Sequence, residues 1–145
     1  MSKLLRRRPE KTQLLQSVPL FGVLSHRQIS QIAGLVTEIV VAAGTRLATA
    51  GEYGRELVII VEGRATVTVG RRRTVSLGPG DFWGEMSLVD GGPRSATVEA
   101  ATDMRLLVIN EHEFSQLLQT APLIAIKIMK VLSQRVRNAE ASYSV

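Results

Sequence analysis

The sequence predicts a mainly β protein with flanking helices, built around an antiparallel barrel or jelly roll. Between residues 36 and 109, short β-rich runs alternate with breaks at glycine, a texture typical of many short strands. Helical patterns with capping residues lie at the two ends of the chain instead. Most of the β-rich runs have no helix between them, which argues against a parallel sheet, because parallel strands need long crossover connections.

The composition allows one domain and excludes several kinds of site. The 145 residues are enough to bury a sizeable core without staples. There is no cysteine, which excludes thiolate metal sites and cysteine nucleophiles and fits a reducing compartment. His26 and His112 are far apart in the sequence and give little basis for a metal site. No apolar run approaches the roughly 20 residues that cross a bilayer, so we expect a cytoplasmic protein without a transmembrane segment.

Residues 1–12 predict a basic, flexible N-terminal tail. Residues 1–11 hold five basic residues and one acidic residue, which contribute +4 of the net charge of +5 and leave +1 for the rest. Such a tail is most often a solvated terminus and less often a contact for acidic lipid, nucleic acid or a protein partner. The small remaining charge argues against nucleic acid binding by this chain alone.

Short helices are expected before the strands, over residues 13–35. Ser25 is followed three residues later by Gln28, and Ile29 and Ile32 follow at helical spacing, which is a capping-box pattern at a helix start. The stretch "KTQLLQSV" is expected to form a separate helical piece. The intervening "VPLFGVL" holds proline and glycine too close together for one long helix.

The strands are expected over residues 36–109. Seven runs of strand length carry the pattern, and glycines mark most of the breaks between them. The runs are VTEIVVA, TRLAT, ELVIIVE, RATVTV, TVSL, SATVEA and MRLLVI. The one long gap in the pattern lies between TVSL and SATVEA.

Helices are expected again over residues 110–143. Asn110 with Glu113 forms a capping-box pattern, and Pro122 is tolerated in the first turn of a long final helix. Two apolar stripes run along this last helix. They consist of Ala125, Met129, Leu132, Val136, Ala139 and Tyr143, and of Ile124, Ile128 and Val131. Either the first stripe is a coiled-coil seam between two chains, or both stripes pack on the barrel.

The long gap in the strand pattern, "DFWGEMSLVDGGPRSAT", has the features of an anion site. Gly84 permits a sharp turn after a strand that ends at about Phe82, and "EMSL" begins a short helix whose first N–H groups lack partners. Arg94 adds a charged donor, whereas Glu85 suits a hydroxyl beside a phosphate because like charges repel. The implied ligand is a phosphorylated sugar. The alternative is a Glu85–Arg94 surface pair.

These residues also carry a family resemblance. "GDFWGEMSL" followed by "GGPRSATVEA" resembles the phosphate-binding cassette of the cyclic nucleotide-binding domain family, which includes the catabolite activator protein, kinase regulatory subunits and gated ion channels. Further segments resemble the family pattern in order: VPLFGVLS, AAGTRLATAGEYGRELVIIVEGRATV, LGPGDF, EFSQLLQTAPLIA and LSQR. The resemblance covers nearly the whole chain. It implies that residues 13–145 form an eight-stranded antiparallel jelly-roll barrel with short N-terminal helices, a phosphate-binding cassette and a long C-terminal helix.

The resemblance implies a role for each cassette residue. Glu85 accepts a hydrogen bond from the ribose 2′-hydroxyl, and Arg94 binds the cyclic phosphate. The hydroxyl of Ser95 reaches the phosphate or the purine edge, and serine at this position favours cAMP without excluding cGMP. Backbone amides complete the phosphate cradle. They belong to Gly84, Glu85, Met86, Ser87 and Ala96.

Four residues outside this set are also singled out. Val67 and Val75 match positions that line the base, with packing in the core as the alternative. Arg135 matches an arginine of the last helix that reaches toward the cassette glutamate and the nucleotide, with a solvated charge as the alternative. Trp83 stands where the family usually has a smaller residue, and it either is a packing variant or narrows the pocket rim.

The function implied by the resemblance is a cyclic nucleotide receptor, with cAMP favoured over cGMP, that couples ligand binding to movement of the last helix. We expect it to act in trans on an unknown protein effector or as a sensor fragment of a larger protein, because few residues follow the last helix. One alternative is a homodimeric interaction module with a degenerate pocket. Another is the sensor domain of a transcription regulator whose DNA-binding part is absent. No catalytic residues and no metal are expected, since ligand binding explains the acid and the base of the cassette.

Overall fold

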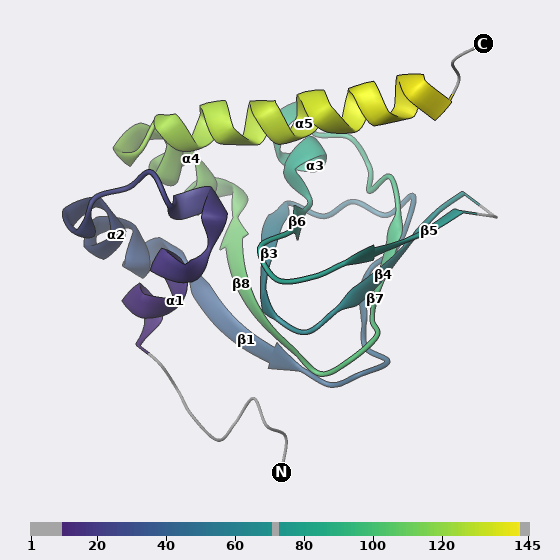
Figure 1. Cartoon of the computed structure of the whole chain (residues 1–145), viewed down its shortest axis with the longest axis horizontal. Coiled ribbons are helices and arrows are strands. Elements are labelled where there is room, and N and C mark those ends of the chain that lie inside the picture. The colour runs from purple at the N-terminus through teal and green to yellow at the C-terminus, as the bar shows by residue number, and fades with distance from the viewer. Residues whose placement is uncertain (1–9, 71–72, 143–145) are drawn as a thin grey trace.

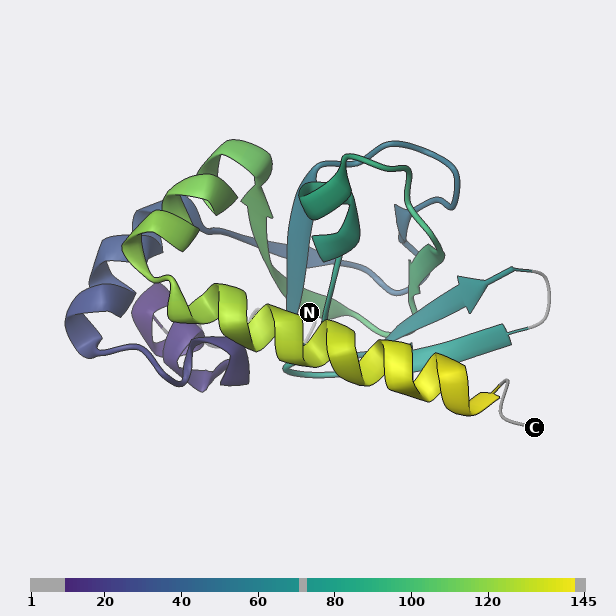
Figure 2. The ribbon, with the colours of Figure 1, turned by 90° about the horizontal axis from the view of Figure 1, so that it is seen from above.

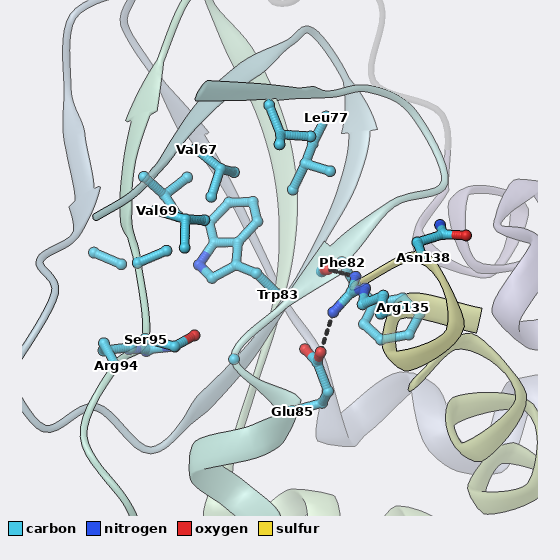
Figure 3. Close-up of a pocket in the computed structure, with 15 residues that line it drawn as sticks. Val67, Val69, Leu77, Phe82, Trp83, Glu85, Arg94, Ser95, Arg135 and Asn138 are labelled. Carbon is cyan, nitrogen blue, oxygen red and sulfur yellow. Dashed lines mark hydrogen bonds and ion pairs between the residues drawn. The ribbon is translucent and has the colours of Figure 1, made fainter. Parts of the chain in front are cut away.

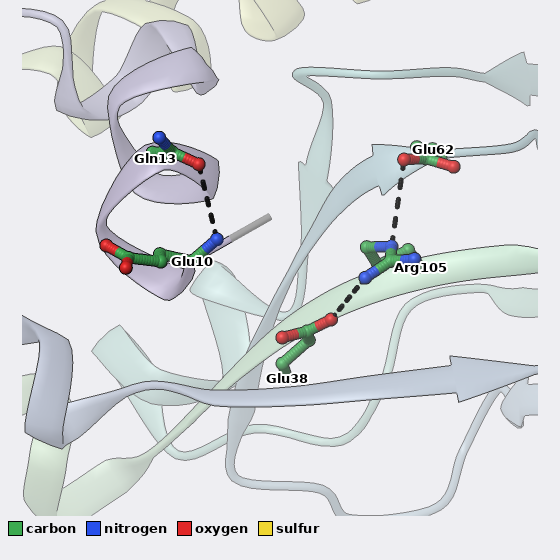
Figure 4. A network of polar contacts seen from close by, with 5 residues as sticks. All are labelled: Glu10, Gln13, Glu38, Glu62 and Arg105. Carbon is green, nitrogen blue, oxygen red and sulfur yellow. Dashed lines mark hydrogen bonds and ion pairs between the residues drawn. The ribbon is translucent and has the colours of Figure 1, made fainter. Parts of the chain in front are cut away.

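The structure is a computed structural model and describes residues 10–70 and 73–142. The predicted basic tail lies outside the described residues up to residue 9. The first helix, α1 (Lys11–Ser17), starts two residues before residue 13, where the first helix was expected to begin. A capping box between Glu10 and Gln13 fixes this start, and Figure 4 shows the half of it in which the Glu10 backbone N–H donates to Oε1 of Gln13.

In the described residues, eight antiparallel strands form the body of the molecule, as predicted, but they make two facing sheets rather than a closed barrel. The strands are β1 (Thr37–Val41), β2 (Arg46–Ala48), β3 (Glu56–Glu62), β4 (Ala65–Val69), β5 (Arg73–Leu77), β6 (Phe82–Trp83), β7 (Thr97–Ala100) and β8 (Met104–Asn110). One sheet has the order β1-β8-β3-β6 and the other has the order β2-β7-β4-β5. These orders pair the first strand with the last and the second with the seventh, which is jelly-roll topology.

The sheet β1-β8-β3-β6 is covered on both faces. On β3, Leu57 and Ile59 belong to a cluster shared with the helices, whereas Val58 and Ile60 belong to a cluster between the two sheets. Successive side chains of a strand point to opposite faces, so all four positions are buried. This double burial explains why "ELVIIVE" is continuously apolar instead of alternating.

A buried arginine links three strands of this sheet (Figure 4). Arg105 on β8 is 1% exposed, and its Nη1 donates to Oε1 of Glu38 on β1 at 2.5 Å. Its Nε lies 3.7 Å from Oε1 of Glu62 on β3. A buried guanidinium needs compensating charge, and the Glu38 and Glu62 carboxylates supply it to Arg105. These contacts also link β8 to its two neighbouring strands, β1 and β3.

Helices cover one side of the sandwich (Figure 1). The predicted capping box of Ser25 and Gln28 is present at the start of α2 (His26–Ile32), and 3₁₀ turns lie at Pro19–Phe21 and Ala33–Leu35. After the strands, Asn110 and Glu113 form the predicted capping box of α4 (Glu111–Thr120). None of the helices in the described part of the chain has the length and apolar character needed to cross a bilayer.

The long last helix, α5 (Leu123–Ser142), crosses the molecule past α3 and past the N-terminal helices (Figures 1 and 2). Its Ile124 and Ile128 are buried in the core, where they pack with Val131. Met129 is 59% exposed and Val136 is 57% exposed, so the expectation that both stripes pack on the barrel is wrong. Helical geometry allows only one such face to meet the sandwich. Tyr143 and the Ala139 side chain lie outside the described part.

Candidate ligand-binding pocket

A cavity of about 490 Å³ opens beside the cassette. Its walls come from the β4 and β5 strands, from β6 and the helix after it, from the segment before β7, and from α5 (Figure 3). The lining residues are Ala48, Val67, Val69, Val75, Leu77, Phe82, Trp83, Gly84, Glu85, Arg94, Ser95, Ala96, Val98, Arg135 and Asn138. Apolar side chains from the β-strands form one part of the wall, and the charged side chains gather at the other.

The predicted turn and short helix are both present. β6 ends at Trp83, Gly84 has a φ of 97°, and α3 runs over Glu85–Asp90. A Cβ atom at residue 84 would lie 2.1 Å from the carbonyl oxygen of Glu56 and 2.6 Å from Nη1 of Arg94. Only glycine fits, because the backbone is left-handed there and a neighbouring carbonyl fills the space of a side chain.

Glu85 is buried in the pocket wall and pairs with the last helix, not with Arg94. It is 2% exposed, and its Oε1 accepts a hydrogen bond from Nη1 of Arg135 (Figure 3). Nη2 of Arg135 donates to the carbonyl oxygen of Phe82 at 2.8 Å, and the guanidinium lies 5.3 Å from the centre of the Phe82 ring. The Glu85–Arg94 surface pair is therefore not formed, and Arg135 is ion-paired with Glu85, although its side chain is 41% exposed.

The second carboxylate oxygen of Glu85 is available to a ligand. Oε2 is buried and accepts no hydrogen bond from the described residues. Burial raises the pKa of Glu85 above its ordinary value, and the charges of Arg135 and Arg94 together with hydrogen bonds oppose that rise. A buried carboxylate oxygen without a donor is costly, so a hydroxyl group that enters the pocket would be favoured there.

The side chain of Arg94 lies between Gly54 and Gly84. Its Nη1 donates to the carbonyl oxygen of Glu56 at 3.4 Å, and a Cβ atom at Gly54 would lie 2.4 Å from its Nε. The backbone of Arg94 is held by the loop before β3, where its N–H donates to the carbonyl oxygen of Glu52 at 2.8 Å. A single long hydrogen bond from the side chain to the described residues leaves most guanidinium donors for an anion.

The other predicted site residues fall into two groups. Val67 and Val75 form a cross-strand pair between β4 and β5 and line the cavity, as do Ser95 and Ala96. Val67 also packs against the core between the sheets, so its two predicted roles are compatible. The remaining two, Met86 and Ser87, lie in the first turn of α3, and their side chains lie outside the described part.

Six lining residues were not assigned to the ligand site by sequence reasoning: Ala48, Val69, Leu77, Phe82, Val98 and Asn138. Val69 and Leu77 each lie two residues beyond a predicted lining position, so the period of two in a strand would have found them. Asn138 lies one turn beyond Arg135 on α5, at helical spacing. The sequence pattern predicts Phe82 only as the end of a strand, and it leaves its neighbour Trp83 as a packing variant or a narrowing of the rim. Ala48 and Val98 lie on β2 and β7. All six line the cavity together with Trp83.

The arrangement suits a ligand with an anionic end, a hydroxyl group and an apolar flat part. Arg94 supplies donors for the anion, Glu85 an acceptor for the hydroxyl, and the β4 and β5 valines an apolar wall. No group of three or more acidic, histidine or cysteine side chains in the described residues could hold a metal ion. Fold and pocket therefore define a jelly-roll domain with a pocket that suits a phosphorylated sugar compound.

The comparison with known proteins identifies the family. Residues 38–121 match the cyclic nucleotide-binding domain family. This match spans more than half of the chain, and the chain belongs to that family. The family is regulatory or sensory rather than catalytic, and its members bind cAMP or cGMP.

Curated relatives and solved structures support this assignment. A cyclic nucleotide-gated potassium channel of Rhizobium etli is 41% identical over 123 residues, which cover 85% of this chain and 34% of the channel. The cyclic AMP receptor protein of Thermus thermophilus is 30% identical over 131 residues, which cover 87% of this chain and 61% of the receptor. The crystal structure of the Thermus thermophilus catabolite activator protein aligns with a TM-score of 0.78 and 29% identity over 86% of this chain and 61% of that one. This chain thus spans a third to three fifths of the length of these relatives.

Proposed function

We propose that the chain is a cAMP receptor domain that converts ligand binding into movement of α5. The observation that carries the proposal is the pairing of two groups in one pocket. Glu85 offers a buried acceptor, Oε2, without a partner in the described residues, and Arg94 lines the same cavity with most of its donors unused. A ribose hydroxyl and a cyclic phosphate are the complement of this pair.

In this proposal each side chain has a defined task. Arg94 binds the phosphate together with backbone amides of Gly84 to Ser87 and of Ala96, because the N–H groups of a first helical turn have no partners within the helix. Oε2 of Glu85 accepts the ribose 2′-hydroxyl. Val67 and Val75 contact the base.

The preference for cAMP over cGMP rests on two observations. Ser95, the neighbour of Arg94 in the chain, lines the cavity. By the family resemblance, serine at this position favours cAMP. A curated relative that is 30% identical over 87% of this chain is a cyclic AMP receptor protein. Titrating cAMP and cGMP in parallel measures this preference.

The proposed coupling runs through Arg135. This residue lies on α5 and reaches both the Glu85 carboxylate and the Phe82 carbonyl oxygen. A ligand that contacts Glu85 therefore contacts a group that already holds α5. Binding shifts the helix only if the ligand has different affinities for two positions of α5.

Replacing Arg94 tests the proposed ligand. Arg94→Ala should weaken cAMP binding by about 2–5 kcal/mol, on the order of 30-fold to several thousand-fold, because the phosphate loses its charged donor. Isothermal titration calorimetry measures the affinity. Arg27→Ala is the matched control, because Arg27 lies on α2 outside the cavity and its loss should leave the affinity unchanged. Equal affinity of the Arg94 variant and the parent would overturn the proposal.

A second candidate function is a homodimeric interaction module with a degenerate pocket. It is favoured by the exposed apolar side chains of Leu123, Ile126, Met129 and Val136 on α5. A protein that binds no cyclic nucleotide but forms a dimer in light scattering would support this function instead of the first.

A further inference from the structure

Trp83 carries a polar atom whose position packing does not explain. It is the single tryptophan of the chain and is 7% exposed. Its indole ring belongs to the core between the two sheets, together with Val58, Ile60 and Val98, and it also lines the cavity. Its Nε1 is buried and donates no hydrogen bond to any of the described residues.

A buried donor without an acceptor is costly, and proteins leave few of them. The ring alone would account for an apolar side chain at position 83, because it fills the space between the sheets. Phenylalanine would bury a similar aromatic surface without a donor. The nitrogen therefore calls for an acceptor that the folded chain does not supply, and the cavity is the place from which one can come.

The orientation of the ring indicates which part of a ligand meets the nitrogen. In Figure 3 the six-membered ring lies near Val67, whereas the nitrogen edge is turned toward the side of the cavity where Ser95 lies. Val67 packs against the same core cluster as Trp83. The nitrogen edge thus lies beside Val69 of β4 in this view and is turned toward the side of the pocket that Ser95 and Arg94 line.

We propose that Trp83 is a ligand-contacting, specificity-determining residue whose Nε1–H donates a hydrogen bond to a phosphate oxygen of the bound cyclic nucleotide. This inference rests on the proposed function and adds to it a donor that is neutral and held rigid by the core. With this contact, the ligand would pair both of the buried polar atoms of the cavity that have no partner in the described residues. Nε1 of Trp83 is a donor and Oε2 of Glu85 is an acceptor, both are buried, and both belong to residues that line one cavity.

The parent protein gives the first test. A single tryptophan yields a single indole N–H cross-peak in a ¹⁵N-correlated NMR spectrum, so the signal of Trp83 needs no assignment. Titration with cAMP should move the indole proton downfield and slow its exchange with solvent, because the proton enters a hydrogen bond to a charged acceptor. An indole proton that keeps its shift and its exchange rate at saturating cAMP would overturn the proposal.

Substitution gives the second test. Trp83→Phe should weaken cAMP binding about tenfold, because the phosphate loses one donor. Replacing Trp83 by its benzothiophene analogue keeps the shape of the ring, removes only the N–H, and should give a similar loss. If Trp83→Phe does not fold, this second variant still decides the question. Full affinity of the benzothiophene variant would leave the tryptophan a packing residue only.

Phosphorothioate analogues identify the acceptor. Sulfur accepts hydrogen bonds more weakly than oxygen, so the loss caused by Trp83→Phe should be much smaller for the one cAMP diastereomer whose sulfur replaces the contacted oxygen. Equal losses for cAMP and for both diastereomers would show that the indole does not contact the phosphate. Failure of the parent to bind any cyclic nucleotide would instead refute the proposed function, so the two failures are distinguishable.

Discussion

At the scale of single residues, the Glu85 carboxyl is subject to opposing effects. Burial disfavours its charged form and raises its pKa, whereas Arg135 and Arg94 favour the charged form. The ligand that we propose is favoured by the charged form, because Oε2 then carries no proton and is free to accept the ribose hydroxyl. Protein stability and ligand affinity should therefore depend on pH in opposite directions.

The sign of the stability effect follows from linkage. Because the pKa of Glu85 is raised in the folded protein above its ordinary value of 4.5, the folded state binds more protons than the unfolded state just above pH 4.5. The contribution of Glu85 to the free energy of unfolding is then fully present below pH 4.5 and is lost as the pH rises through the folded pKa. Affinity for cAMP should increase over the same window.

Urea unfolding and calorimetric titration from pH 4.5 to 7, on the parent and on Glu85→Gln, measure both effects. The glutamine variant keeps the shape of the side chain and cannot titrate, so its stability should fall less with rising pH than that of the parent. A parent that gains stability relative to Glu85→Gln over this range would contradict the expected sign. A pH-independent affinity of the parent would contradict the role of the carboxylate.

At the scale of secondary-structure elements, α5 presents one face to the core and another to solvent. Ile128 is 3% exposed and Met129, the next residue, is 59% exposed. Their side chains are of similar size, and the two residues lie in the same helical turn. The pair therefore isolates burial from helix propensity.

Ile128→Ala should lower the free energy of unfolding by about 2–5 kcal/mol, because it leaves a cavity in the core. Met129→Ala should change it by less than about 0.5 kcal/mol, since an exposed side chain loses little on truncation. Urea denaturation compares the two variants with the parent. Losses of equal size would mean that Met129 is covered, as it would be in a dimer, and light scattering at the same protein concentration would detect that state.

The helix starts show which boundaries the local sequence predicts and which it does not. The capping boxes of α2 and α4 use Ser25 and Asn110, which are strong N-cap residues, and both starts were predicted. The start of α1 was predicted two residues late, because its capping box uses Glu10. Glutamate is not among the preferred N-cap residues, so the pattern gave no signal there.

At the scale of the whole molecule, Arg135 joins segments that are 50 residues apart. It holds the start of β6 and the start of α3 to the outer half of α5. Beyond Leu132, α5 has no buried side chain among those described. Because so little apolar packing holds this half of the helix, the Arg135 contacts make up much of its link to the cassette.

Hydrogen exchange measured by mass spectrometry tests this link. Addition of cAMP should change the exchange rates of amides in the outer half of α5, and Arg135→Ala should remove most of that change, because the helix then no longer contacts the ligated carboxylate. Arg137→Ala is the matched control, since Arg137 is an exposed residue of the same helix. If the Arg135 and Arg137 variants respond to cAMP like the parent, α5 is not coupled through Arg135.

The sequence by itself determined the features that depend on neighbours along the chain. The strand runs, the left-handed turn at Gly84 and the short helix after it follow from local propensity, and the cassette motif indicated the family. Only the tertiary structure decided which distant groups meet. The partner of Glu85 is Arg135 instead of Arg94, the stripe of Ile124 and Ile128 is buried while Met129 is exposed, and Nε1 of Trp83 has no acceptor in the described chain. These outcomes depend on how the two sheets and α5 pack, because burial and pairing are set by residues far apart in sequence, which no local pattern records.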